Sequence, residues 1–228
     1  MRPISRGFWA PLLFVCVFLA VHCICQKAQK RIKQSKTGQC PKGPKDGFDA
    51  LIQEGSKHFG SNYEISEHCY KLAIEAKPNN ALAYYNTGLA QLNSGRTKVA
   101  IKTFQRALEI NPRYAEAYFG LGSALYDGGG GSLSDASRAL TTSVSLNPRL
   151  FPSYNQLGNV LLAQGKHNLA LQAYQRVIAI NPASPEGHGN AARILSAQGR
   201  HDDAISEFGA AALLQPLNPM LLYELGVA

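Results

Sequence analysis

Two helical stripes and the turn between them can be read in one stretch of the chain, YNQLGNVLLAQGKHNLALQAYQRVIAINP (residues 154–182). Gly165 separates two sets of apolar and small residues whose members are three, four or seven positions apart: Tyr154, Leu157, Gly158 and Leu161, then Ala170, Tyr174 and Val177. This spacing places each set on one face of an α-helix. Pro182 ends the second helix, because its ring and missing N–H cannot continue one. The stretch therefore predicts a helical hairpin.

The same hairpin recurs along the chain at a nearly fixed period. Successive units are closed by Pro78, Pro112, Pro148, Pro182 and Pro216, which are 34, 36, 34 and 34 residues apart. A period in this range is typical of a solenoid, in which each hairpin buries its apolar stripe against its neighbours. The predicted units are residues 48–80, 81–114, 115–150, 151–184 and 185–218, followed by a partial unit at 219–228.

These units resemble the tetratricopeptide repeat, whose signature is an aromatic residue, a Leu-Gly pair, a second large residue, and then Ala, an aromatic residue, Ala and Pro. Residues 81–114 carry this signature as Tyr84, Gly88, Ala100, Phe104, Ala107 and Pro112. Thr87 and Gln91 depart from its apolar positions, and His188 replaces the aromatic residue of 185–218. The resemblance covers residues 48–228. It implies an all-α, right-handed α-solenoid of stacked helix-turn-helix hairpins whose first helices line a concave side.

A second stripe on each first helix would then face this concave side. It carries aromatic and aliphatic residues in the early units and amides in the later ones, which suits a peptide with apolar anchors. The alternative is ordinary solvated surface, because single exposed aromatic residues are common. The expected groove residues are Tyr85, Asn86, Leu89, Phe119, Ser123, Tyr126, Asn155, Gln156, Asn159, Asn190 and Arg193.

The sixth position of each unit leaves a second function open. It holds Gln53, Asn86, Gly120, Gln156, Asn190 and Glu224, and amides there can grip a peptide backbone without reading its sequence. A comparable ladder is found in the O-linked N-acetylglucosamine transferases, which these repeats resemble loosely. The alternative function is therefore a substrate-binding arm of such a protein-modifying enzyme.

One known ligand class of the family is not expected here. Chaperone-binding members hold a C-terminal carboxylate with Lys, Asn, Asn, Lys and Arg, and the matching positions of this chain are Ile52, Ser56, Asn86, Glu116 and Gly120. Only Asn86 agrees with that set, so no cation would neutralise a bound carboxylate. We expect no binding of the acidic tails of heat-shock chaperones.

Charge and chemistry point away from nucleic acid and from catalysis. The formal net charge of +8 lies before residue 47, and residues 47–228 carry 14 basic and 14 acidic side chains. A folded nucleic-acid-binding domain would need an excess of basic residues. The glycine run at residues 128–131 lacks the Lys-Ser/Thr of a phosphate-binding loop, and no catalytic or metal-ligating set is recognisable. We expect a protein-interaction scaffold that is not an enzyme and holds no metal or cofactor.

The N-terminus is predicted to direct the chain to a membrane. Residues 7–25 are 19 positions without a formal charge, and residues 26–47 form a basic Gly/Pro/Lys linker. Residues 1–25 are either a retained signal-anchor or a cleaved signal peptide. The basic flank favours a single-pass anchor with cytosolic repeats, because positive flanks stay cytoplasmic. Cleavage would instead place the repeats in the secretory lumen or outside the cell.

The five cysteines do not form a disulfide framework. Cys16, Cys23 and Cys25 lie in the apolar segment, which leaves Cys40 and Cys69 as the one pair that a disulfide could use. Neither has the spacing of a zinc ligand to a histidine. We expect Cys40 and Cys69 to be isolated thiols.

Overall fold

The computed structural model describes residues 47–128, 132–220 and 226 of the chain. The predicted hydrophobic segment at residues 1–25 and the linker up to residue 46 lie outside these residues, as does most of the partial unit at 219–228. The described residues form ten longer helices: α2 (Phe48–His58), α3 (Tyr63–Ala76), α4 (Ala81–Asn93), α5 (Thr97–Ile110), α6 (Ala115–Asp127), α7 (Leu133–Leu146), α8 (Phe151–Ala163), α9 (His167–Ile180), α10 (Pro185–Ala197) and α11 (His201–Leu214).

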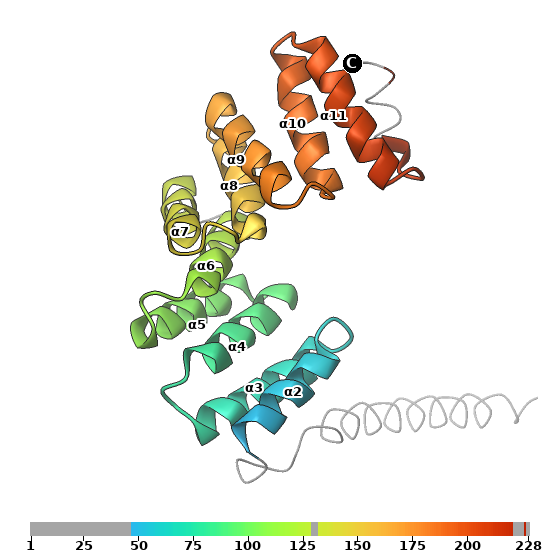
Figure 1. Ribbon diagram of the computed structural model, residues 1–228. Coiled ribbons are helices and arrows are strands. Elements are labelled where there is room, and N and C mark those ends of the chain that lie inside the picture. Colours follow the sequence, from blue (N-terminus) through green and yellow to red (C-terminus); the bar gives the residue numbers. More distant parts are fainter. Residues whose placement is uncertain (1–46, 129–131, 221–225, 227–228) are drawn as a thin grey trace, which may run out of the picture.

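Consecutive helices pair into five hairpins, from α2 and α3 to α10 and α11, and each hairpin packs against the next (Figure 1). The first helices also meet each other in the middle of the array, where α6 contacts both α4 and α8. The predicted all-α solenoid is therefore confirmed. Its core is a row of small clusters between neighbouring hairpins, as expected for a repeat protein.

Each of the first four hairpins closes around a large side chain from its second helix. Tyr70, Phe104, Leu140 and Tyr174 are at most 2% exposed and lie against glycines of the preceding helix. A Cβ atom added at Gly158 would be 2.6 Å from Cε1 of Tyr174, closer than carbon atoms can approach. The glycine therefore lets the two helices approach closely enough to bury the ring.

The turns inside four of the five hairpins contain a left-handed glycine, namely Gly60, Gly95, Gly165 and Gly199. Gly165 has a φ of 72°, a value that side-chain-bearing residues rarely adopt. Backbone hydrogen bonds from Gly165 to Leu162 and from Lys166 to Leu161 close the end of α8, in the manner of a Schellman motif. Gly95 and Gly199 repeat this conformation in the second and fifth units, so the glycine turn predicted from the sequence is confirmed.

A buried polar network joins the first two hairpins. Glu67 on α3 is 5% exposed and accepts hydrogen bonds from Gln91 on α4 and from Arg96, and Lys71 pairs with the same carboxylate. The Oε1 atom of Gln91 accepts from the Thr103 hydroxyl at 2.7 Å. Gln91 therefore departs from the apolar pattern of the family because it satisfies a buried carboxylate, which would be costly without partners.

The network predicts an acid-sensitive stability. Burial by itself would raise the pKa of Glu67, but the hydrogen bonds from Arg96, Gln91 and Lys71 outweigh it and hold the pKa below the ordinary value of 4.5. A lowered pKa in the folded state stabilises the protein above that ordinary value, and this stabilisation is lost as the pH falls through the folded value. At pH 7 we expect Glu67→Gln to lower the free energy of unfolding by about 1.5–3 kcal/mol, the range for hydrogen bonds to a charged group.

Urea unfolding at pH 7 and pH 3 checks this expectation. The difference between the wild-type protein and Glu67→Gln should shrink at pH 3, because that pH lies below the ordinary pKa of 4.5 and the carboxyl of the unfolded chain then binds a proton. Glu109→Gln is the matched control, because Glu109 pairs with Arg106 on an exposed surface and such pairs contribute little. A difference of the same size at both pH values would contradict the assigned role of the carboxylate.

Cys69 differs from its sequence-based prediction. The prediction of isolated thiols is wrong for Cys69, which is fully buried and disulfide-bonded. The sequence spacing carried no sign of this bond, because loop closure brings distant residues together.

His188 fills a packing position, as predicted, and is 9% exposed. It also hydrogen-bonds through one ring nitrogen to Glu207 and through the other to the Pro182 carbonyl oxygen.

Candidate peptide-binding groove

The first helices α4, α6, α8 and α10 carry the residues that the sequence predicts for the groove (Figure 1). Most of these side chains are half-buried, whereas Arg193 is exposed and Ser123 is buried at 8% exposure. Ser123 therefore offers little surface to a ligand. The remaining members have partly exposed side chains, and their assignment to a ligand site stays a prediction.

The aromatic end of the groove is closely packed. The Tyr85 ring lies 5.3 Å from the Tyr114 ring and 6.1 Å from the Phe104 ring, measured between ring centroids. Burial, followed by the nearby Glu116 carboxylate, raises the pKa of Tyr85 to about 12. Phe119 and Tyr126 pack in turn against the buried cluster that contains Leu140. A ligand would meet side chains that already pack against their neighbours, and such packing reduces the entropy lost on binding.

The amide end is partly tied together by its own hydrogen bonds. Asn159 accepts a hydrogen bond from the Tyr174 hydroxyl at 2.7 Å and donates one to Gln156 at 3.3 Å. Asn190 on α10 donates to Asn155 on α8 across a longer 3.5 Å contact. Within the part of the chain that the structure describes, no side-chain hydrogen bond uses the Nδ2 atom of Asn155 or the Nε2 atom of Gln156, so both donors are available to a ligand.

The two ends meet around the hydroxyl of Tyr174. Burial raises the pKa of this tyrosine, the positive charge of Arg193 opposes the rise and Tyr126 adds to it. Tyr126, Asn159, Tyr174 and Arg193 come from α6, α8, α9 and α10 and combine an aromatic ring, an amide and a cation. We call these four residues the hydroxyl cluster.

Sequence reasoning missed Tyr174 as a member of this site. Its place in the repeat predicts packing between hairpins, and its ring does pack there. The residue is fully buried, and its hydroxyl hydrogen-bonds to the groove residue Asn159. A tyrosine rather than phenylalanine at this position is the one sequence signal that could have found it. Gly120 interrupts the amide ladder for a related reason, since a Cβ atom there would lie 2.6 Å from the Phe104 ring.

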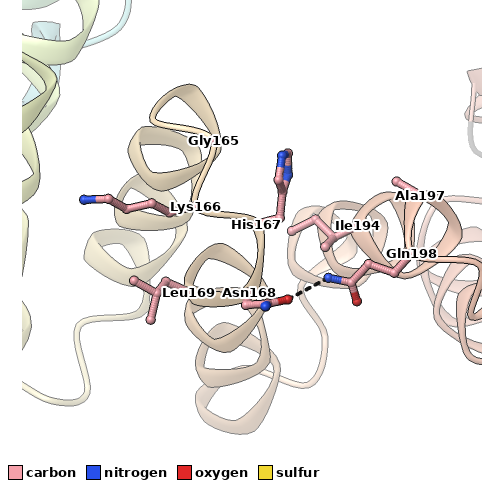
Figure 2. Close-up of a pocket in the computed structure, with 8 residues that line it drawn as sticks. All are labelled: Gly165, Lys166, His167, Asn168, Leu169, Ile194, Ala197 and Gln198. Atoms are coloured by element: carbon pink, nitrogen blue, oxygen red, sulfur yellow. Dashed lines mark hydrogen bonds between the residues drawn. The ribbon is translucent and has the colours of Figure 1, made fainter.

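A separate hollow lies where the turn between α8 and α9 faces α10 (Figure 2). The side chains of Asn168 and Gln198 meet across it through a hydrogen bond of 2.9 Å, and Lys166 and His167 stand at its edge. None of the predicted groove residues lines this hollow. It is therefore distinct from the concave groove.

None of the described helices combines the length and the apolar character that crossing a bilayer requires. Among the same residues, no group of three or more His, Cys, Asp or Glu side chains is placed to hold a metal ion.

Comparison with family models identifies the repeat. Models described as tetratricopeptide repeats match residues 69–101, 92–129, 128–185, 155–220 and 190–228. Together these matches extend without a break from residue 69 to the end of the chain. They include the fifth hairpin and the partial unit that follows it.

Curated relatives share only part of their length with this chain. The peroxisomal targeting signal receptor of Kluyveromyces lactis is 28% identical over 91 residues, which are 39% of this chain and 16% of that protein. The small glutamine-rich tetratricopeptide repeat-containing protein 2 of Mycosarcoma maydis is 30% identical over 101 residues, which are 44% of this chain and 28% of that protein. The chain thus spans less than a third of the length of either relative.

Solved structures show the same fold over most of the chain. MamA is 26% identical with a TM-score of 0.62, over 71% of this chain and 94% of its own. PilF of Pseudomonas aeruginosa is 22% identical with a TM-score of 0.72, over 80% of this chain and 83% of its own. YrrB, described as a TPR protein with an unusual peptide-binding site, is 22% identical with a TM-score of 0.60, over 78% of this chain and 92% of its own.

Proposed function

Since the chain belongs to the tetratricopeptide repeat family, we propose that it is a protein-interaction scaffold that binds peptide segments along its first helices. The described residues would act in binding and not in catalysis. Two similar proteins support this proposal by name, one a targeting signal receptor and the other a TPR protein with a peptide-binding site. These two similarities support peptide binding in general. The kind of ligand is inferred from the residues of this chain.

The observation that carries the proposal is the hydroxyl cluster. Tyr126 supplies aromatic surface, the buried Tyr174 holds Asn159 in place through its hydroxyl, and Arg193 supplies an exposed cation that suits a carboxylate or a carbonyl oxygen. The available amide donors of Asn155 and Gln156 lie on the same helix as Asn159. These groups favour a segment that presents backbone carbonyl oxygens and an apolar side chain.

Replacement of exposed groove residues tests the proposal. We expect the double variant Tyr126→Ala/Arg193→Ala to weaken peptide binding at least tenfold, because it removes an anchor surface and a cation while leaving the buried ring of Tyr174 in place. Fluorescence anisotropy with peptides selected from a random display library measures the change.

Two controls keep this test specific. The variant Lys102→Ala/Gln105→Ala changes two exposed residues of α5 outside the groove and should leave affinity unchanged. An acidic heat-shock chaperone tail should not compete with the selected peptides for the concave groove, because the family's carboxylate-binding cations are missing there. Equal affinity of the groove variant and the wild-type protein would contradict the proposed site.

For location we propose the secretory lumen or the outside of the cell, after cleavage of residues 1–25. The basic flank favours cytosolic repeats only if the segment is retained. The disulfide at Cys69 supports an oxidising compartment, since disulfides are rare in the cytosol. We propose Cys40 as the second sulfur, because Cys16, Cys23 and Cys25 belong to the apolar segment.

Expression with microsomes tests the location and the bond together. We expect the repeats to be protected from protease and the chain to be shortened. In denaturant, which exposes the buried Cys69, we expect this residue to react with maleimide only after reduction. Cys40→Ser should expose the Cys69 thiol to maleimide in denaturant without reduction. A full-length chain that is digested, with a Cys69 thiol that is already free, would instead show a membrane-tethered scaffold with cytosolic repeats.

A further inference from the structure

A second groove opens on the other face of the array, between the second helices α7 and α9. It has a volume of about 770 Å³. Ser137 and Thr141 of α7 form one wall, and Leu157 and Leu161 of α8 lie at its floor beside Tyr154. The opposite wall is α9. This groove shares no residue with the concave groove on the first helices, so we call it the α7–α9 groove.

The groove exists because one side chain of the third repeat is small. The fifth residue of the second helix is Glu67, Ile101, Ser137, Leu171 and Ile205 in successive hairpins. Ile101 packs against the core of the second repeat, and Leu171 is buried at 7% exposure. Glu67 occupies the corresponding place with its polar network. Ser137 is too short to fill the space, so α8 stays accessible between α7 and α9.

One helical turn further along α7, the side chain in the same wall of the groove is also short. Thr141 stands where the second and fourth repeats have Gln105 and Gln175. Neither the Ser137 hydroxyl nor the Thr141 hydroxyl forms a hydrogen bond with another described residue, so both are available to a ligand. The wall is thus short and polar, whereas the floor is apolar.

The charges at the groove have one sign. Lys166 and Arg176 are exposed at its edge, and none of its lining residues is acidic. Neither cation forms an ion pair within the part of the chain that the structure describes. Leu169 lies between these two cations in the sequence. Its side chain is 49% exposed and adds an apolar group to the rim of the groove. An apolar floor with cations at the rim matches an acidic segment that carries an aliphatic side chain.

We propose that the α7–α9 groove is a second docking site, which binds an acidic peptide segment of a partner protein with an aliphatic side chain inserted beside Ser137. Charge argues against the chain's own N-terminal region as the occupant, since residues 26–46 carry seven Lys or Arg side chains and one Asp. The scaffold would thereby hold two segments at once, one on each face, and their combined binding would be tighter than either alone.

Filling the groove with the residues of the neighbouring repeat tests the proposal. The variant Ser137→Leu/Thr141→Gln gives the third repeat the residues that the fourth has at these positions, Leu171 and Gln175. We expect it to fold with an unchanged or higher unfolding temperature, because it replaces empty space by an apolar contact. Its loss of binding would therefore not reflect a loss of structure.

The probe is a random library of 12-residue peptides displayed on phage and selected against the full chain. Peptides that rely on the groove should carry acidic and aliphatic residues and should bind Ser137→Leu/Thr141→Gln at least tenfold more weakly than the wild-type protein. Lys166→Glu/Arg176→Glu should weaken the same peptides, with Lys102→Glu as an exposed control. Ser145→Leu, on the same helix outside the groove, should leave them unchanged.

Three outcomes would overturn the proposal. The first is that no selected peptide distinguishes Ser137→Leu/Thr141→Gln from the wild-type protein. The second is that the selected peptides that depend on the α7–α9 groove carry no acidic residues. The third is that every selected peptide is weakened by Tyr126→Ala/Arg193→Ala alone, which would place all binding in the concave groove and leave the function proposed above intact.

Discussion

Tyr174→Ala is expected to lower the free energy of unfolding by about 3–5 kcal/mol, the cost of truncating a fully buried aromatic ring. The ring is completely buried and lies in one cluster with Ala191, Ala192 and Leu195 of the next hairpin. Its loss leaves a cavity that the glycine-lined surface of α8 cannot collapse to fill. Guanidinium unfolding followed by far-UV circular dichroism measures the effect.

Two related variants separate the ring from its hydroxyl and from general surface effects. Tyr174→Phe keeps the packing and removes the 2.7 Å hydrogen bond to Asn159, so we expect a loss of about 1 kcal/mol. Leu213→Ala truncates a side chain that is 85% exposed and should change stability by less than about 0.5 kcal/mol. If Tyr174→Ala lost no more than Tyr174→Phe, the ring would not be the link between the fourth and fifth hairpins.

Periodicity made most of this fold predictable. The spacing of Pro112, Pro148 and Pro182 gives the hairpins, because a proline ends each second helix at the same point. Gly165 gives the turn, because glycine adopts a left-handed backbone readily. Both signals are local, and they repeat, so each unit supports the interpretation of the next.

Interactions between repeats were less predictable. Glu67 and Gln91 are 24 residues apart and meet because neighbouring hairpins stack, so neither residue alone indicates a network. The α7–α9 groove likewise follows from Ser137, which becomes meaningful only when aligned with Ile101 and Leu171 in the structure. The Cys69 disulfide is a third case, since the spacing of cysteines does not show which sulfur atoms a fold brings together.

The concave groove was predictable in its position and not in its chemistry. The repeat indicates which helix faces a ligand, and α4, α6, α8 and α10 carry the expected side chains. The state of each group depends on its neighbours: Asn159 gives its acceptor to Tyr174, whereas Asn155 keeps a donor available. Such differences arise from side-chain contacts across helices, which a repeat pattern does not contain.

Gly120→Ala tests how tightly neighbouring hairpins are packed. Gly88 and Gly120 both lie against Phe104, and Cβ atoms added at these positions would be 2.7 and 2.6 Å from its Cε1 atom. The ring has no room to move away from one glycine, because the other holds it. We expect Gly120→Ala to lower the free energy of unfolding by about 1–3 kcal/mol, as overpacking of a rigid core does.

Gly209→Ala is a matched control, for which we expect a change in the free energy of unfolding of the opposite sign. Gly209 lies in α11, and a Cβ atom there meets nothing within 4 Å, so Gly209→Ala should stabilise the protein by about 0.5–1 kcal/mol through helix propensity. Urea unfolding of both variants compares the same chemical change in crowded and open surroundings. Combining Gly120→Ala with Phe104→Leu should recover part of the loss, because a smaller side chain gives the methyl group room. A stabilising Gly120→Ala would mean that the hairpins can separate at little cost, and the close stacking that buries Phe104 would not be what holds the array together.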